Sequence, residues 1–202
     1  MFNKKGAMFG LDARIALAIF GALSVISGAA LYGAIQDAKV TRMMTDANEL
    51  GKAAEAYLLD TGSYIKKSVD YPGSSLHSNS LITNTESLDN WQGPYIGFEM
   101  CQYCGSDYFA YPMFDEQIYI GYYKADDWVS YSDRSCGDSD RCGLFVVFDG
   151  VPPDSLVYAL ETKVDGTVSP TDTSLTGKLR YSRSAGNWIY YDISIPYDKF
   201  KN

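Results

Sequence analysis

Histidine and positive charge are both scarce in this chain. Among 202 residues there is one histidine, His77, and the 17 lysines and arginines are outnumbered by 25 aspartates and glutamates. A Ser-His-Asp or Cys-His active site has to centre on His77, which lies in a polar stretch without periodicity, so we do not expect an enzyme. The formal net charge of −8 argues against broad electrostatic binding of nucleic acid.

Charge is also missing from one long stretch near the N-terminus. The sequence from Ile15 to Ile35, IALAIFGALSVISGAALYGAI, contains no charged residue. At about 1.5 Å per residue, a helix of this length crosses the hydrocarbon core of a bilayer. Lys4 and Lys5 precede it, and positive residues hold that end of a membrane helix in the cytoplasm. We therefore expect the rest of the chain to be exported.

The helical pattern continues beyond the charge-free stretch. Over 36–60, apolar residues recur three and four positions apart and charged residues fill the other faces. Gly51 is the only weak point, and Gly62 supplies a C-terminal glycine. The pattern predicts one helix from about Phe9 to Leu59, apolar on all sides over 8–35 and on one side afterwards.

A secretory signal peptide or a plain signal anchor is the alternative interpretation. A basic start, an apolar stretch and the small residues of 27–30 are typical of such segments. A cleaved signal should give way to unrelated sequence, whereas here the helical period continues. On this alternative, the chain is a signal-anchored or secreted periplasmic binding or redox domain that does not polymerise.

An acid stands at the edge of the apolar stretch, where a simple anchor has little use for one. Asp12 precedes Gly21 by nine residues. The short basic leader, the acid at this spacing and the long helix resemble type IV pilins and the pseudopilins of type II secretion. In that family a prepilin peptidase removes the leader on the cytoplasmic side, and the acid is the fifth residue of the mature chain.

The resemblance implies a leader at 1–7, with Gly6, Ala7 and Met8 at the cleavage site. The family usually has glycine before the cut, phenylalanine after it and glutamate as the acid, where this chain has Ala7, Met8 and Asp12. A cut after Gly6 instead makes Asp12 the sixth residue. Arg14 is also unusual in this region of the family.

The same resemblance implies how such a subunit assembles. The new α-amine at Met8 pairs with the acid of a neighbouring copy, so that Asp12, together with Arg14 and Gly21, belongs to the assembly region. The expected partners are further copies in a filament, the prepilin peptidase and an inner-membrane assembly platform. The bacterial subunit first spans the inner membrane once, with a periplasmic head, and then enters a surface pilus or a periplasmic pseudopilus. Its new N-terminus is expected to be methylated.

The remaining part, 61–202, is long enough to form one globular head with its own core. From Tyr108 onwards, short runs rich in aromatic and β-branched residues are separated by turn formers, as is typical of strands. The predicted strands are YFAYPMF, QIYIGYY, WVSYS, LFVVF, SLVYALE, KLRYS and WIYYDISI. A long helix followed by such runs predicts an α+β, pilin-like fold with an antiparallel β-sheet.

All four cysteines lie in the head, at Cys101, Cys104, Cys136 and Cys142. An even number of cysteines in an exported domain favours disulfides, and four cysteines allow three pairings. Zinc is an alternative because CQYC has ligand spacing, but the second pair is spaced too widely for a common zinc ribbon. A redox centre is a further alternative, although CQYC does not open a predicted helix.

Oxygen ligands gather in the loop between the second pair of cysteines and its flanks. Asp133, Asp138 and Asp140 lie in SDRSCGDSDRCG, and oxygen-rich loops suit calcium. No EF-hand spacing is present, and Asx turns explain the same aspartates. We therefore expect no cofactor, and calcium at these aspartates is kept as an alternative.

Two further stretches resemble pilin-like proteins. SLDNWQGPYIG contains a Gly93-Pro94 turn, which Trp91 and Tyr95 are large enough to seat on the core. Later, an acid-glycine turn at Asp165 precedes a threonine-glycine pair that ends at Gly177. We interpret the first stretch as a packing motif, and the second as support for the family.

Overall fold

The computed structural model describes residues 5–68, 74–105, 107–114, 116–150, 152–166, 173–182 and 188–197, with side chains from Gly10 onwards. The chain divides into two compact units, Met1–Thr41 and Arg42–Asn202. Each unit is described by itself.

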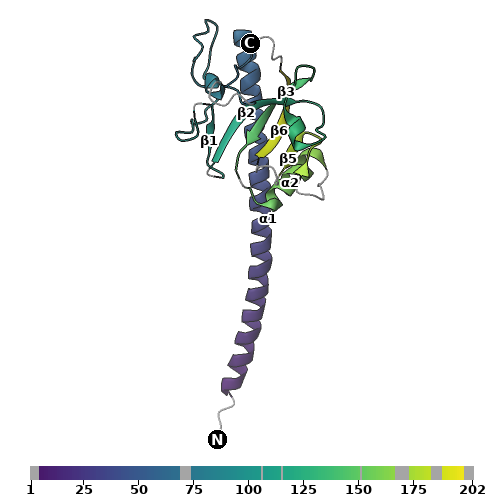
Figure 1. The fold of residues 1–202 in the computed structure, drawn as a ribbon. Helices are drawn as coiled ribbons and strands as arrows, with labels where there is room; N and C mark the ends of the chain where they lie inside the picture. The colour runs from purple at the N-terminus through teal and green to yellow at the C-terminus, as the bar shows by residue number, and fades with distance from the viewer. Residues whose placement is uncertain are drawn as a thin grey trace. The chain divides into compact units, whose positions relative to one another are not determined.

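Helix α1, Lys5–Thr61, forms the described part of the first unit and continues into the second (Figure 1). The helix ends where Gly62 adopts a φ of +69° and donates its N–H to the carbonyl of Leu58 at 2.9 Å. Glycine adopts this left-handed conformation without steric cost, which explains the stop. The predicted long helix and its glycine end are confirmed.

The second unit contains a six-stranded antiparallel sheet. Its strands are β1 (Phe109–Tyr111), β2 (Glu116–Lys124), β3 (Cys142–Phe148), β4 (Thr173–Ser174), β5 (Leu179–Ser182) and β6 (Trp188–Pro196). The strand order is β1-β2-β3-β6-β5-β4. All seven residues of the central strand β3 are buried. The α+β class with an antiparallel sheet is therefore confirmed.

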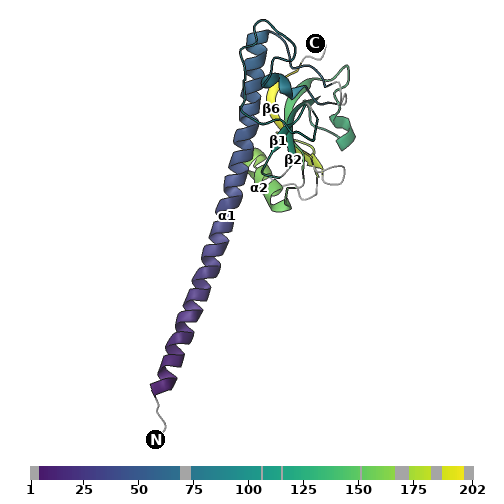
Figure 2. The ribbon, with the colours of Figure 1, turned by 90° about the vertical axis from the view of Figure 1, so that its left-hand side faces the viewer.

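The last turns of α1 pack on this sheet within the second unit, and Figure 2 shows β6 alongside them. A Cβ placed on Gly51 would lie 3.2 Å from Cβ of Ile193 on β6. The Tyr111 hydroxyl of β1 donates to Asp46 at 3.0 Å. The buried helix residues in this unit include Met43, Ala47, Leu50, Ala53, Ala54 and Tyr57. The predicted amphipathic face thus forms part of the core.

One predicted strand is wrong. The run SLVYALE lies inside helix α2, Asp154–Asp165. Leu156, Val157 and Leu160 are its buried apolar residues, and their spacing places them on one face of a helix. Gly166, with a φ of +74°, ends α2 by donating its N–H to the carbonyl of Thr162. The apolar run is too short for its composition alone to tell a strand from a helix.

A second predicted strand is also wrong. The run WVSYS forms no strand and leads into the 3-10 helix η2, Tyr131–Arg134. The Trp128 indole donates to the carbonyl of Lys124, and the Asp133 carboxylate accepts the N–H of Val129. These local bonds hold the segment against the end of β2, and Asp133 takes up a backbone donor that a neighbouring strand would need.

The segment between α1 and β1 is more ordered than a connecting loop. It contains the 3-10 helix η1, Ser78–Leu81, with buried residues, and the bridge Ser75↔Gly121 joins it to β2. Trp91 donates its indole N–H to the carbonyl of Ser80, and the Tyr95 ring meets the Tyr57 ring edge-on at 5.9 Å. The predicted turn at Gly93-Pro94 is therefore seated on the core as expected.

The acid-glycine turn and the threonine-glycine pair are joined in space. The Asp165 carboxylate accepts the backbone N–H groups of Lys178 and Leu179, each at 2.9 Å. Gly177 has a φ of +80°, and a Cβ there would lie 2.9 Å from the carboxylate carbon of Asp165. The two parts of this sequence motif thus form one structural unit that connects α2 to β5.

Candidate functional site: an exposed apolar helix and the surface of the head

The apolar half of α1 is exposed along its described length. Every residue from Gly10 to Ile35 is solvent-exposed within the chain. The large apolar side chains among them are Leu11, Ile15, Leu17, Ile19, Phe20, Leu23, Val25, Ile26, Leu31, Tyr32 and Ile35. In length and composition the helix can cross a membrane, which fits a single-pass anchor near the N-terminus. We call the segment from Gly10 to Ile35 the stem.

Two charges interrupt the stem at its N-terminal end. Asp12 and Arg14 are the only charged residues from Gly10 to Ile35, and both are solvent-exposed within the chain. Two residues correspond to a rotation of about 200° in a helix with 3.6 residues per turn. The acid and the base therefore lie on nearly opposite faces of α1 and do not neutralise each other.

The stem glycines have open space around them within this chain. A Cβ placed on Gly21, Gly28 or Gly33 would meet nothing within 4 Å. Among the described residues no contact accounts for these glycines, whereas small residues allow two helices to approach closely. The expected cleavage residues Gly6, Ala7 and Met8 lie in the first turns of α1, and their side chains are outside the described part.

The four cysteines form two disulfides, Cys101–Cys104 and Cys136–Cys142. Each disulfide joins two cysteines that are close in the sequence, and this is one of the pairings that the sequence left open. Cys101 and Cys104 pack against a buried aromatic cluster that contains Tyr108, Tyr119, Tyr123, Trp128, Phe145 and Tyr190. The structure therefore agrees with structural disulfides.

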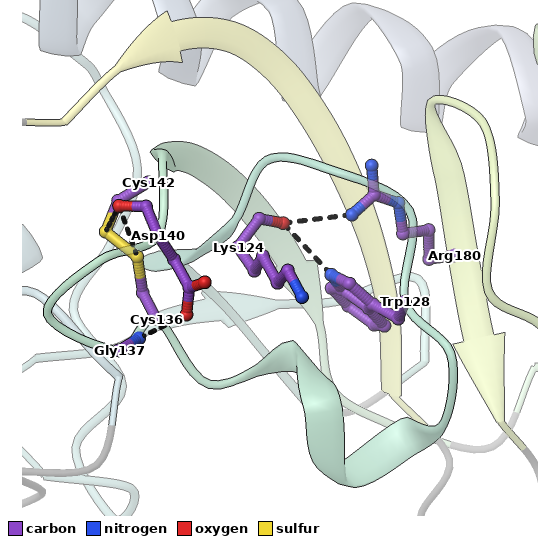
Figure 3. The surroundings of a disulfide bond; sticks show 7 residues. All are labelled: Lys124, Trp128, Cys136, Gly137, Asp140, Cys142 and Arg180. Atoms are coloured by element: carbon purple, nitrogen blue, oxygen red, sulfur yellow. Dashed lines mark hydrogen bonds between the residues drawn. A yellow bond between two sulfur atoms is a disulfide. The ribbon is translucent and has the colours of Figure 1, made fainter.

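The predicted calcium loop has other interactions (Figure 3). Asp133 accepts the N–H of Val129 at 3.1 Å and pairs with Lys124, and these bonds lower the pKa of its carboxyl group. Asp140 accepts the N–H of Gly137 at 2.8 Å. Within the described ranges, Asp133, Asp138 and Asp140 do not form a cluster that could hold a metal ion. Calcium binding stays a prediction.

A buried arginine is a feature that the sequence did not indicate. The guanidinium of Arg180 on β5 donates to the carbonyls of Lys124, Ala125 and Asp126 at 3.0, 2.8 and 3.0 Å. It also lies 4.9 Å from the centre of the Trp128 ring. Figure 3 shows the Lys124 carbonyl accepting from both Arg180 and Trp128. Burial lowers the pKa of Arg180, and the surrounding carbonyls hold the charge in place.

His77 has an acid and a hydroxyl beside it. Its Nε2 lies 3.4 Å from Oδ1 of the buried Asp107, and its Nδ1 lies 3.4 Å from the Ser80 hydroxyl. The Ser68 hydroxyl also donates to Asp107. Because Ser80 is only 1% exposed, a substrate in solution does not reach its oxygen. The cluster ties the segment after α1 to the segment after the first disulfide.

The head also carries an open cleft, of about 530 Å³, beside the second disulfide. Tyr64 and Tyr197 supply aromatic surface, while Asp140, Arg141 and Asp192 supply charge. The cleft follows the end of β6, where Ser194 has a φ of +60° and its N–H is held by the Asp192 side chain. Sequence reasoning did not predict this hollow, which lies beside a register shift between β3 and β6 at Gly143.

No family model matches the chain, and no characterised protein and no solved structure is significantly similar to it.

Proposed function

We propose that this protein is a membrane-anchored subunit of a helical filament. The observation that carries the proposal is the contrast within α1: its first half exposes apolar side chains on all sides, while the end of the helix belongs to the core of the head. Such a stem is stable in a bilayer, where lipid covers it. When the stem leaves the membrane, the apolar stems of other copies are the surfaces that can cover its apolar side chains.

The proposed filament is a type IV pilus or a type II secretion-like pseudopilus. The leader spacing, Asp12 and the two sequence motifs of the head support this narrower proposal. A prepilin peptidase cuts at Gly6, Ala7 or Met8, and an inner-membrane assembly platform then moves the stem from the lipid into the filament. The open space around Gly21, Gly28 and Gly33 supports close packing of neighbouring stems.

The N-terminus of the protein in native membranes tests this proposal. Mass spectrometry of the N-terminal peptide should show a chain that begins at Met8 or Ala7 and carries an added methyl group. The sheared surface fraction should contain the same processed chain in high-molecular-weight material. A chain that begins near Leu31 indicates an ordinary cleaved signal, and an intact Met1 indicates a plain anchor. Either result contradicts the proposal.

Asp12 provides a second test. Asp12→Ala should leave the protein in the membrane fraction and remove filaments, because the acid is needed only when a neighbouring stem supplies a positive group. Asp37→Ala is the matched control, since Asp37 is an exposed acid of the same helix beyond the apolar stretch. A wild-type filament yield from Asp12→Ala contradicts the assembly role of this residue.

A membrane-anchored binding domain that does not polymerise is the second candidate, and the cleft favours it. Aromatic rings of Tyr64 and Tyr197 beside Arg141 and Asp192 suit a small polar ligand. On this candidate, the leader stays attached and no filament forms. Arg141→Ala then changes ligand-induced thermal stabilisation of the head, whereas a filament subunit shows the processed N-terminus described above.

A further inference from the structure

Asp12 and Arg14 have opposite charges on opposite faces of one apolar helix. From Asp12 to Asp37 the only charged residue between them is Arg14, so both charges have apolar neighbours such as Leu11 and Ile15. A charge among apolar side chains is costly unless an opposite charge meets it. Because the two residues do not face each other in one chain, Asp12 and Arg14 of a single copy do not pair with each other.

We propose that Asp12 of one copy pairs with Arg14 of the next copy in the assembly. This inference rests on the proposed filament function and names a specific contact within it. Charge complementarity identifies the partner as a second copy of the same stem. Asp12 on one face of a stem meets Arg14 on the opposite face of an identical stem. The axial offset between the two residues is only about 3 Å, so neighbouring helices need little displacement to align them.

The placement of the charges also determines the symmetry of the contact. In a two-fold dimer, the same patch meets itself, which would bring two Asp12 side chains or two Arg14 side chains together. Opposite patches on opposite faces instead make a head-to-tail contact, in which every copy uses one face for the copy before it and the other face for the copy after it. Such a contact does not close on itself unless the rotation completes a ring, and it propagates as a filament.

The pairing predicts a specific pattern among charge variants. Asp12→Asn and Arg14→Gln should each reduce filament yield at least about tenfold, since each leaves one unpaired charge in the packed stems. The double exchange Asp12→Arg with Arg14→Asp should restore the yield to within about twofold of wild type, because every pair is re-formed with its sign reversed. The N-terminal peptide of each variant is checked by mass, so that a loss of leader processing is not mistaken for a loss of pairing.

Co-expression separates a contact between copies from an effect within one copy. Asp12→Arg alone gives a stem with two positive charges, and Arg14→Asp alone gives a stem with two negative charges. Neither variant should assemble by itself. When both are expressed together, each acidic face meets a basic face of the other variant, and mixed filaments with the two chains in alternation should form.

A cysteine pair gives a measurement that does not depend on filament yield. Replacing Asp12 and Arg14 together by cysteine removes both charges at once and leaves no unpaired charge. Oxidation in membranes or filaments should then join copies into a ladder of multimers. Asp12→Cys alone and Arg14→Cys alone should give no such ladder, because the proposed contact joins position 12 to position 14.

Four outcomes overturn the inference. Wild-type filament yield from Arg14→Gln shows that the arginine is not the partner, and would leave the α-amine of a neighbouring copy as the only positive group. Failure of both the double exchange and the co-expressed pair shows that the residues act separately. Loss of the variants from the membrane fraction assigns the charges to the lipid interface. If the wild-type chain forms no filament, the proposed function fails, and the pairing fails with it.

Discussion

The two halves of α1 share a secondary structure and differ in what surrounds their apolar side chains. Leu23, in the stem, is 58% exposed, whereas Leu50, near the end of the helix, is fully buried. The stem has apolar residues on all sides and two exposed charges, Asp12 and Arg14, on nearly opposite faces. The end of the helix has one apolar face against β6 and charged residues elsewhere.

The difference shows that two successive parts of one helix can cover their apolar side chains in different ways. A helix that is apolar all round needs an apolar environment on every side, which means lipid or other copies of itself. An amphipathic helix needs only one apolar surface, and the sheet of its own chain supplies it. Substitutions of the same kind in the two halves should therefore have different consequences.

The largest difference is expected for leucine. Leu50→Ala should lower the free energy of unfolding of the head by about 2–5 kcal/mol, because it removes buried methyl groups and leaves a cavity. Leu23→Ala should change it by less than about 0.5 kcal/mol in detergent, because the side chain is not part of the head. Denaturant unfolding followed by tryptophan fluorescence measures both, since all three tryptophans lie in the head. Equal effects of the two substitutions would contradict the comparison.

Substitutions of charged residues should also have different effects in the stem and in the head. Arg180→Met should destabilise the head by about 3 kcal/mol, because the substitution removes the hydrogen bonds from the buried guanidinium to the carbonyls of Lys124, Ala125 and Asp126. Arg14→Met should leave the unfolding of the head unchanged and affect assembly alone. The control inside the head is Arg141→Met, since Arg141 is 79% exposed and forms a surface ion pair with Asp126. No measurable effect is expected for it in thermal unfolding of the head.

Substitutions of glycine should also have different effects in the two halves of α1. Gly51→Val should lower head stability by about 1–3 kcal/mol, because its Cβ and methyl groups would press against Ile193. Gly28→Val should not alter head unfolding, since a Cβ at this position would meet nothing within 4 Å among the described residues. In a filament, the same substitution should reduce yield by preventing close approach of the stems. Head stability and filament yield, measured side by side, separate the two effects.

The smallest effect is expected for Asp133. Its pKa is lowered by the Val129 N–H and by Lys124, so the stabilisation is present above the ordinary aspartate pKa of about 3.9 and is lost as the pH falls through the lower folded-state value. Between pH 7 and pH 3, the melting temperature of the head should therefore fall slightly more in the wild type than in Asp133→Asn. An identical pH dependence in both would show that the carboxylate contributes nothing.

The long helix and the sheet could be predicted because their signals are local and periodic. The uncharged stretch, the repeating apolar positions and Gly62 all lie within the helix or at its end. The strands around Ile120 and Val146 are runs of β-branched and aromatic residues, which fit a sheet. The exact end of α1 depends on one glycine, and the sequence contains that glycine.

The two wrongly predicted strands are runs that are too short for their composition to distinguish a strand from another local structure. Leu156, Val157 and Leu160 occur in a continuous apolar run, LVYAL, whose length also suits a buried strand. Trp128 belongs to an aromatic run, but the Asp133 carboxylate takes up the local backbone donor, and that contact depends on a side chain four residues away. Neither outcome follows from propensity alone, because competing local hydrogen bonds decide it.

The residues of the candidate site also include some that the sequence predicts and some that it does not. The stem residues could be identified because composition alone marks them. Arg180 and Asp107 could not, since their importance arises from residues far away in the sequence. The three carbonyls at Arg180 belong to the last residue of β2 and the two residues after it, more than fifty positions earlier, and His77 is thirty positions before Asp107. Such contacts appear only when the chain has folded.

The disulfides have a mechanical consequence. They join residues three and six positions apart, with Cα–Cα distances of 5.4 and 5.8 Å. At about 3.4 Å per residue, the two bonds together shorten a fully stretched chain by only about 20 Å. A head pulled open under tension could therefore lengthen almost as far as one without disulfides. Its resistance to force rests on the packing of α1, β6 and β3, and not on covalent bonds.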